Sequence, residues 1–114
     1  IGYQQHVAAS AQTSAMIAEL YKGNWQRACS YWHNSIAEAA RADLYPHYAA
    51  VKSAALDDGV MGVCVSGSGP SIIAIHAHEQ PKLARVMQQA CQFESKVYSG
   101  AIPAPGATII ADGL

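Results

Sequence analysis

The segment "GVCVSGSGPSIIAI" (residues 62–75) decides the fold of the second half of this chain. Two short apolar runs, residues 60–65 and 71–76, flank the segment "SGSGP", and both runs are rich in β-branched residues. Apolar runs bounded by turn-forming residues predict two strands that pair as a hairpin. Because successive positions in both runs are apolar, we expect both faces of these strands to be covered.

The first half of the chain carries helical signals instead. Residues 4–22 predict one helix, which Gly23 ends. A second, continuous helix is predicted after Asn24, because an apolar face repeats at intervals of three and four residues: Trp25, Ala28, Cys29, Trp32 and Ile36. A third helix is expected from Pro46 to the "DDG" at 57–59.

Beyond the hairpin, residues 79–93 predict a fourth helix, and the segments "SKVYSG" (95–100) and "GATIIA" (106–111) predict two more strands. The element order is therefore ααα-ββ-α-ββ. This order predicts a single α+β domain over residues 1–114, with helices layered on an antiparallel sheet. A ferredoxin-like two-layer sandwich is the natural arrangement.

The composition limits the classes of partner. The 114 residues carry a formal net charge of -1, which excludes an electrostatic surface for nucleic acid or acidic membranes. No apolar run has the length of a membrane-spanning helix, and three widely spaced cysteines favour a reducing, cytoplasmic setting. Charged residues make up 13%, against the usual ~25%, so we expect some apolar surface to face a partner or another domain.

Two features are candidates for chemistry, and each has a purely structural alternative. In "SGSGP", Ser66, Gly67, Ser68 and Gly69 either form a turn or direct N–H and O–H donors at an anion. Arg41 has two interpretations. It either interacts favourably with the dipole at the C-terminal end of its helix and pairs with Glu38, or it binds a substrate carboxylate through its planar guanidinium group. The residues alone do not decide between these alternatives.

The remaining candidates favour structural roles. His33 is interpreted as a partly buried histidine with satisfied hydrogen bonds and Cys64 as a small residue of the core, and His76 with His78 does not complete a metal-ligand set. No serine, histidine and aspartate combination or carboxylate pair stands out by spacing. We therefore predict neither a metal ligand nor a catalytic residue in this chain.

The hairpin nevertheless resembles a known pattern. "GVCVSGSGPSIIAI" is similar to the third conserved motif of the GHMP kinases, in which an S-G-S/A-G-P-S/T segment separates two apolar strands. Within that family, residues 33–62 resemble the homoserine kinases, with matching residues at Ile36, Glu38, Arg41, Leu44, Pro46 and Tyr48. The chain departs from that pattern at Ala39–Ala40, at Ala104–Pro105 and at Thr108.

The resemblance implies the C-terminal domain of a kinase that transfers phosphate from ATP, with Mg²⁺, to L-homoserine in threonine biosynthesis. It implies that Arg41 binds the substrate and that Ser66, Gly67, Ser68 and Gly69 lie near the nucleotide. The nucleotide and Mg²⁺ would be bound mainly by an N-terminal domain absent from this chain, so the chain alone is expected to be inactive. Expected partners are L-homoserine, the N-terminal domain and a second copy in a homodimer.

Two alternatives remain at this stage. The chain could belong to another GHMP kinase that acts on a sugar or an isoprenoid alcohol. It could also be a non-catalytic ferredoxin-like module that binds a small effector or mediates dimer contact, since the low charged fraction and the aromatic residues Trp25, Tyr31 and Trp32 permit this.

Overall fold

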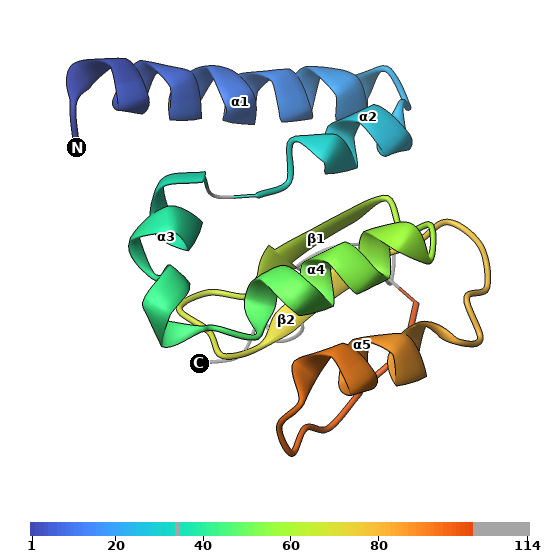
Figure 1. Cartoon of the computed structure of the whole chain (residues 1–114). Helices are drawn as coiled ribbons and strands as arrows, with labels where there is room; N and C mark the ends of the chain where they lie inside the picture. Colours follow the sequence, from blue (N-terminus) through green and yellow to red (C-terminus); the bar gives the residue numbers. More distant parts are fainter. Residues whose placement is uncertain (34, 102–114) are drawn as a thin grey trace, which may run out of the picture.

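A computed structural model describes residues 1–33 and 35–101 of the chain. It shows an α+β arrangement in which helices pack around a two-stranded antiparallel hairpin (Figure 1). In order, the elements are α1 (Tyr3–Tyr21), α2 (Trp25–Ser30), α3 (Ser35–Ala40), a 3₁₀ turn η1 (Ala42–Leu44), α4 (Tyr48–Asp57), β1 (Gly62–Val65), β2 (Ile72–Ile75) and α5 (Leu83–Cys91).

The core lies where α4 packs against α5 and β1. Its buried members are Ala55, Val60, Val63 and Leu83, and partly buried side chains from β2 and α5 pack against them. The strand pairing runs from Gly62 opposite Ile75 to Val65 opposite Ile72, so the segment between Val65 and Ile72 forms the hairpin loop. The predicted hairpin is confirmed, although Ile73 of β2 is 39% exposed and only β1 is covered on both faces.

The predicted first, third and fourth helices form, with shifted ends. Gly23 follows α1 with a φ of +74°, as expected for a helix-ending glycine. Pro46 lies just before α4, whose N-cap is His47. Gly59, with a φ of +93°, follows the end of that helix.

The prediction of one continuous second helix is wrong, because the chain leaves the helix after Ser30 and re-enters one at Ser35. The Gln12 side chain of α1 explains the break. Its Nε2 donates hydrogen bonds to the carbonyl oxygens of Tyr31 (2.8 Å) and His33 (2.7 Å), and so stabilises a non-helical connection. Gln12 lies 19 and 21 residues before these two partners in the sequence, so the periodicity of apolar residues in the segment 25–36 could not reveal the break.

The prediction of a strand over residues 95–100 is also wrong. This segment has no regular secondary structure, and Tyr98 is 87% exposed. A strand needs a paired neighbour and a covered face, and β-propensity alone does not supply them. The last predicted strand, residues 106–111, lies outside the described residues.

Gly62 packs directly against α2, and this contact yields a prediction about stability. A Cβ atom at position 62 would lie 2.6 Å from the carbonyl oxygen of Cys29, which is backbone and cannot rotate away. We expect Gly62→Ala to lower the free energy of unfolding by about 1–3 kcal/mol, measured by urea denaturation. The control is Gly100→Ala, where a Cβ meets nothing within 4 Å. Equal unfolding free energies for the two variants would contradict the tight packing of β1 on α2.

Candidate functional site

The hairpin loop is held by two of its own hydrogen bonds. The amide of Ser66 donates to the Ser71 carbonyl (2.8 Å), and the amide of Gly69 donates to the Ser66 carbonyl (2.9 Å). Gly67 and Gly69 have φ values of +56° and +83°, which glycine adopts without strain. Among the described residues, the N–H groups of Gly67 and Ser68 have no hydrogen-bond partner. The loop therefore has two backbone donors free for a ligand.

Tyr45 fastens this loop to the connection between α3 and α4. Its hydroxyl donates a hydrogen bond to the carbonyl oxygen of Ser68. Its ring lies where a Cβ atom of residue 69 would be, so a side chain at that position would have to displace the tyrosine. The loop and the segment that carries Arg41 are therefore positioned together.

A cavity of about 120 Å³ opens between this segment and the hairpin. It is lined by Ala37, Glu38, Arg41, Ala42, Tyr45, Tyr48, Val65 and Gly67. Two features singled out in the sequence, Arg41 and the glycine-rich loop, therefore meet at one cavity although 26 residues separate Arg41 from Gly67. Ser66, Ser68 and Gly69 belong to the same loop but do not line the cavity.

The charges at the cavity differ from the expected pairing of Glu38 with Arg41. The Glu38 carboxylate forms its ion pair with Lys52 of α4, at 3.1 Å. Lys52 in turn lies 5.3 Å from the centre of the Tyr48 ring. Within the described part of the chain, the Arg41 guanidinium makes neither an ion pair nor a hydrogen bond, and only the backbone of this residue is hydrogen-bonded. The positive charge of Lys52 offsets the negative charge of the Glu38 carboxylate. The charge of the Arg41 guanidinium is therefore not offset by Glu38, and it attracts an anion to the cavity.

Tyr48 adds a polar group to the same cavity. Burial, followed by the neighbouring Glu38 carboxylate, raises the pKa of Tyr48 well above its usual value. Its hydroxyl therefore stays protonated at neutral pH. The oxygen is buried and makes no hydrogen bond of good geometry with a described group, although the Glu38 carboxylate lies close enough to raise its pKa. A buried hydroxyl without a partner is costly to leave unsatisfied, and it suits a ligand that supplies an acceptor.

Sequence reasoning identified Arg41 and Gly67 but not the tyrosines beside them. Tyr48 was assigned to a helix face, although its place in the homoserine kinase pattern was a usable signal. Tyr45 had no such signal, because its contacts with Ser68 and the Gly69 position depend on tertiary structure. The sequence presents Glu38 as a partner of Arg41 and as a match to the homoserine kinase pattern, but not as the partner of Lys52.

The other candidate groups lie outside this cavity. The Nδ1 atom of His76 lies 2.6 Å from the His78 carbonyl oxygen, and no group of three or more potential metal ligands occurs within residues 1–33 and 35–101. Cys29 and Cys64 are buried free thiols, and burial raises the pKa of both. Among the described helices, none is long and apolar enough to cross a membrane.

Comparison with known proteins gives this geometry a context. The pattern of the GHMP kinases C-terminal region matches residues 16–92, which is more than half of the chain. The chain belongs to the GHMP kinase family. The homoserine kinase of Thermoplasma volcanium is 30% identical over 95 residues, covering 83% of this chain and 29% of that protein. That of Pyrobaculum islandicum is 36% identical over 94 residues, covering 82% and 32%.

A solved structure agrees with these relatives. The crystal structure of the homoserine kinase from Cytophaga hutchinsonii superposes with a TM-score of 0.70 at 33% identity, over 79% of this chain and 29% of that one. The GHMP kinase chain described here thus spans about a third of the length of the relatives it matches. The expected α+β fold and the resemblance to the GHMP kinase C-terminal domain are both confirmed.

Proposed function

We propose that this chain is the C-terminal domain of an ATP-dependent homoserine kinase that acts in threonine biosynthesis in the cytoplasm. The observation that carries the proposal is the shared cavity, in which Arg41 and the hairpin residue Gly67 face one small space. A cavity of about 120 Å³ suits a substrate of a few heavy atoms. The matched relatives are named homoserine kinases, which supports an amino-acid substrate.

In this proposal, Arg41 binds the substrate carboxylate through two parallel N–H···O hydrogen bonds. The protonated Tyr48 hydroxyl donates a further hydrogen bond within the cavity. Together these groups orient the substrate, and positioning accounts for most of the catalysis in phosphoryl transfer.

The nucleotide would lie beside the hairpin loop. The free N–H groups of Gly67 and Ser68 could donate hydrogen bonds to a phosphate oxygen. The space beside Gly67 is open, because a Cβ atom at this position would meet nothing within 4 Å, so a phosphate could approach the backbone there. ATP supplies the phosphoryl group, and Mg²⁺ neutralises its charge. Since the described residues offer no cluster of carboxylates, we assign Mg²⁺ and most nucleotide contacts to an N-terminal domain.

The test is an ADP-release assay on the full-length protein with Mg²⁺ and ATP. We expect turnover with L-homoserine, and at least about 100-fold lower kcat/KM with galactose or mevalonate. The 114-residue chain, assayed alone, should show no turnover. Preference for a sugar or an isoprenoid alcohol would assign a different GHMP kinase substrate. The absence of ATP-dependent turnover with any of these alcohols would contradict the proposal.

A further inference from the structure

Lys52 of α4 holds the acidic side chain that lines the cavity. Its Nζ atom lies 3.1 Å from Oε2 of Glu38 and 5.3 Å from the centre of the Tyr48 ring. The side chains of Lys52 and Glu38 are 29% and 13% exposed, so water reaches little of the pair. Partly buried charges are screened much less than surface charges. The ion pair therefore fixes the direction of the Glu38 carboxylate.

The negative charge of Glu38 acts on α4 and β1. Burial, followed by the Glu38 carboxylate, raises the pKa of Tyr48 on α4 and the pKa of Cys64 on β1. The nearby Lys52 charge opposes this shift in the pKa of Cys64. Within residues 1–33 and 35–101, Arg41 forms no ion pair with Glu38. The carboxylate is therefore engaged on the α4 side of the cavity and leaves the guanidinium open.

The sequence places Glu38 and Arg41 where they would otherwise pair. They are three residues apart, and the Arg41 amide donates to the Ala37 carbonyl (3.1 Å), so the helical turn extends to this position. Residues three apart on a helix are neighbours, and opposite charges at this spacing attract. Both side chains also line the same cavity. Pairing with Glu38 would occupy the guanidinium fork that a carboxylate ligand needs.

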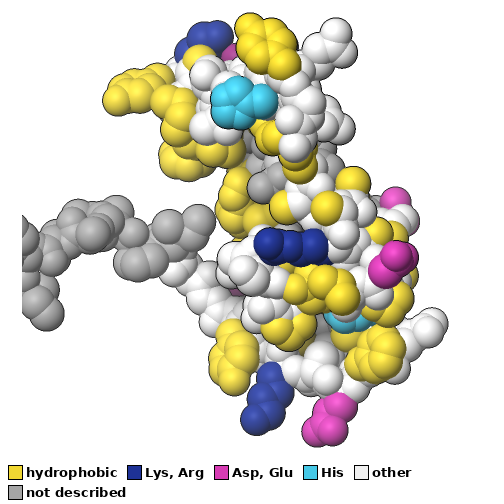
Figure 2. Space-filling model, turned by 90° about the vertical axis from the view of Figure 1, so that its left-hand side faces the viewer, with side chains coloured by type: hydrophobic (Ala, Val, Ile, Leu, Met, Phe, Trp, Pro, Cys, Tyr) yellow, Lys and Arg dark blue, Asp and Glu magenta, His cyan; other side chains and the backbone are white. Residues whose placement is uncertain are grey.

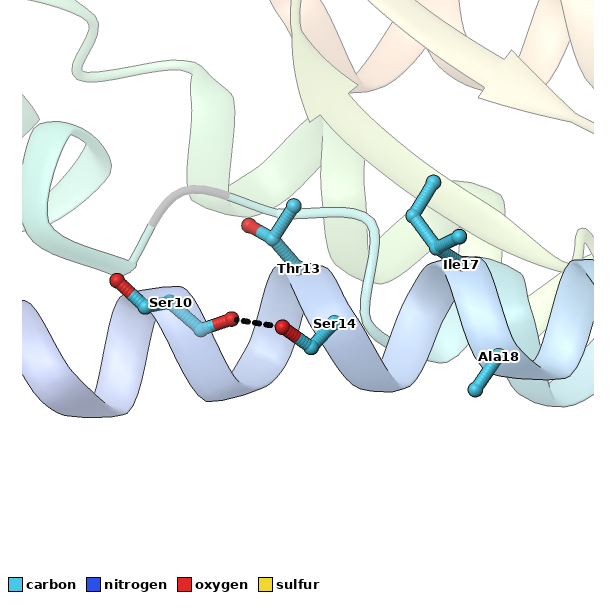
Figure 3. Close-up of a pocket in the computed structure, with 5 residues that line it drawn as sticks. All are labelled: Ser10, Thr13, Ser14, Ile17 and Ala18. Carbon is cyan, nitrogen blue, oxygen red and sulfur yellow. Dashed lines mark hydrogen bonds between the residues drawn. The ribbon is translucent and has the colours of Figure 1, made fainter.

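The surroundings of this cavity are poor in charge. On the side of the molecule that carries α3, a basic side chain lies among hydrophobic and uncharged ones (Figure 2). A shallow hollow elsewhere, on α1, is lined by uncharged side chains: Ser10, Thr13, Ser14, Ile17 and Ala18 (Figure 3). The cavity beside the hairpin differs from that hollow, because an anion and a cation line it together. The charge that it presents to a ligand therefore depends on which partner Glu38 takes.

We propose that Lys52 is a positioning residue that holds Glu38 away from Arg41, and so makes the cavity selective for alcohols that carry a carboxylate. The inference rests on the proposed function, in which Arg41 binds the substrate carboxylate. Lys52 does not line the cavity, so it acts through Glu38 and does not touch the substrate. Without the Lys52 charge, Glu38 would turn to Arg41 and compete with the substrate.

The experiment compares two alcohols on the full-length protein in the ADP-release assay. They are L-homoserine and L-homoserinamide, which has a neutral amide in place of the carboxylate. The ratio of their kcat/KM values measures how strongly Arg41 favours the carboxylate. We expect Lys52→Met to lower this ratio at least about 10-fold, because an internal hydrogen bond between charged groups competes with the substrate. Lys52→Arg keeps the charge and should stay within about threefold of the unmodified protein.

Two controls separate this role from a structural one. Lys22→Met removes an ion pair of the same 3.1 Å length, formed with Glu19 of α1, and should leave the ratio unchanged. In a Glu38→Gln background no carboxylate remains to compete, so adding Lys52→Met should change the ratio by less than about threefold. A merely structural defect would lower kcat/KM for both alcohols together and would leave the ratio as it was.

A crystal structure of the full-length Lys52→Met protein tests the same change without activity. The Glu38 carboxylate should lie within about 4 Å of the Arg41 guanidinium. A carboxylate that stays off Arg41, or a ratio equal to that of Lys22→Met, would overturn the role of Lys52. If the unmodified protein does not turn over L-homoserine, the proposed function fails, and the crystal structure alone decides the role of Lys52. If Lys52→Met is unfolded by circular dichroism, Lys52→Gln removes the charge for both measurements.

Discussion

We expect Arg41→Ala to lower kcat/KM for homoserine by about 100- to 10,000-fold in the full-length protein, and to change the KM for ATP by less than about threefold. The size follows from the loss of two hydrogen bonds between charged groups, each contributing about 1.5–3 kcal/mol. Arg41 lines the cavity and has no described ion-pair partner, so its removal leaves no buried carboxylate unpaired. The measurement is steady-state kinetics with each substrate varied in turn.

Two further variants make this result specific to the cavity. Arg41→Lys keeps the positive charge but not the planar fork, so it should still lose at least about 10-fold in kcat/KM. Arg85→Ala removes a cation from the exposed face of α5 and should behave like the unmodified protein. If Arg41→Ala and Arg85→Ala have the same kcat/KM for homoserine, Arg41 does not bind the substrate. If both variants retain ATP-dependent turnover, the proposal that the protein is a kinase stands, even though the role of Arg41 is contradicted.

The parts of the fold that sequence predicted are those determined by local signals. The hairpin follows from two β-branched runs around "SGSGP", and α1 follows from a segment of good helix formers ended by Gly23. The break between α2 and α3 was missed because the Gln12 side chain creates it from a distant part of the chain. Residues 95–100 were misassigned because a strand requires a partner that composition does not reveal.

The site was also predictable only in part, because some of its contacts join residues that are distant in the sequence. The family pattern pointed to Arg41 and to the glycine-rich loop, and the structure places both at one cavity. The pairing of Glu38 with Lys52, rather than with its near neighbour Arg41, depends on the tertiary structure, which brings Lys52 of α4 within 3.1 Å of Glu38 in α3. Because that choice leaves the guanidinium without a described ion pair, tertiary packing determines the electrostatic character of the cavity.

The second large effect is expected at Gly69, where backbone conformation and packing coincide. A side chain at this position meets two obstacles: the φ of +83° and the ring of Tyr45. Gly67 provides a matched control, because its φ is +56° but a Cβ there meets nothing within 4 Å. We expect Gly67→Ala to lower the free energy of unfolding by about 1 kcal/mol, and Gly69→Ala by about 3 kcal/mol, in urea denaturation of the full-length protein.

A double-mutant cycle separates the two obstacles at position 69. Tyr45→Ala removes the ring and the hydrogen bond to Ser68, and with it the collision but not the backbone strain. The Gly69→Ala and Tyr45→Ala changes should therefore be non-additive by about 1–2 kcal/mol, with the pair less destabilising than the sum of the two single changes. Additive effects would mean that Tyr45 does not contact the loop. Non-additivity would establish that the connection carrying Arg41 and the glycine-rich loop are held in register by one tyrosine.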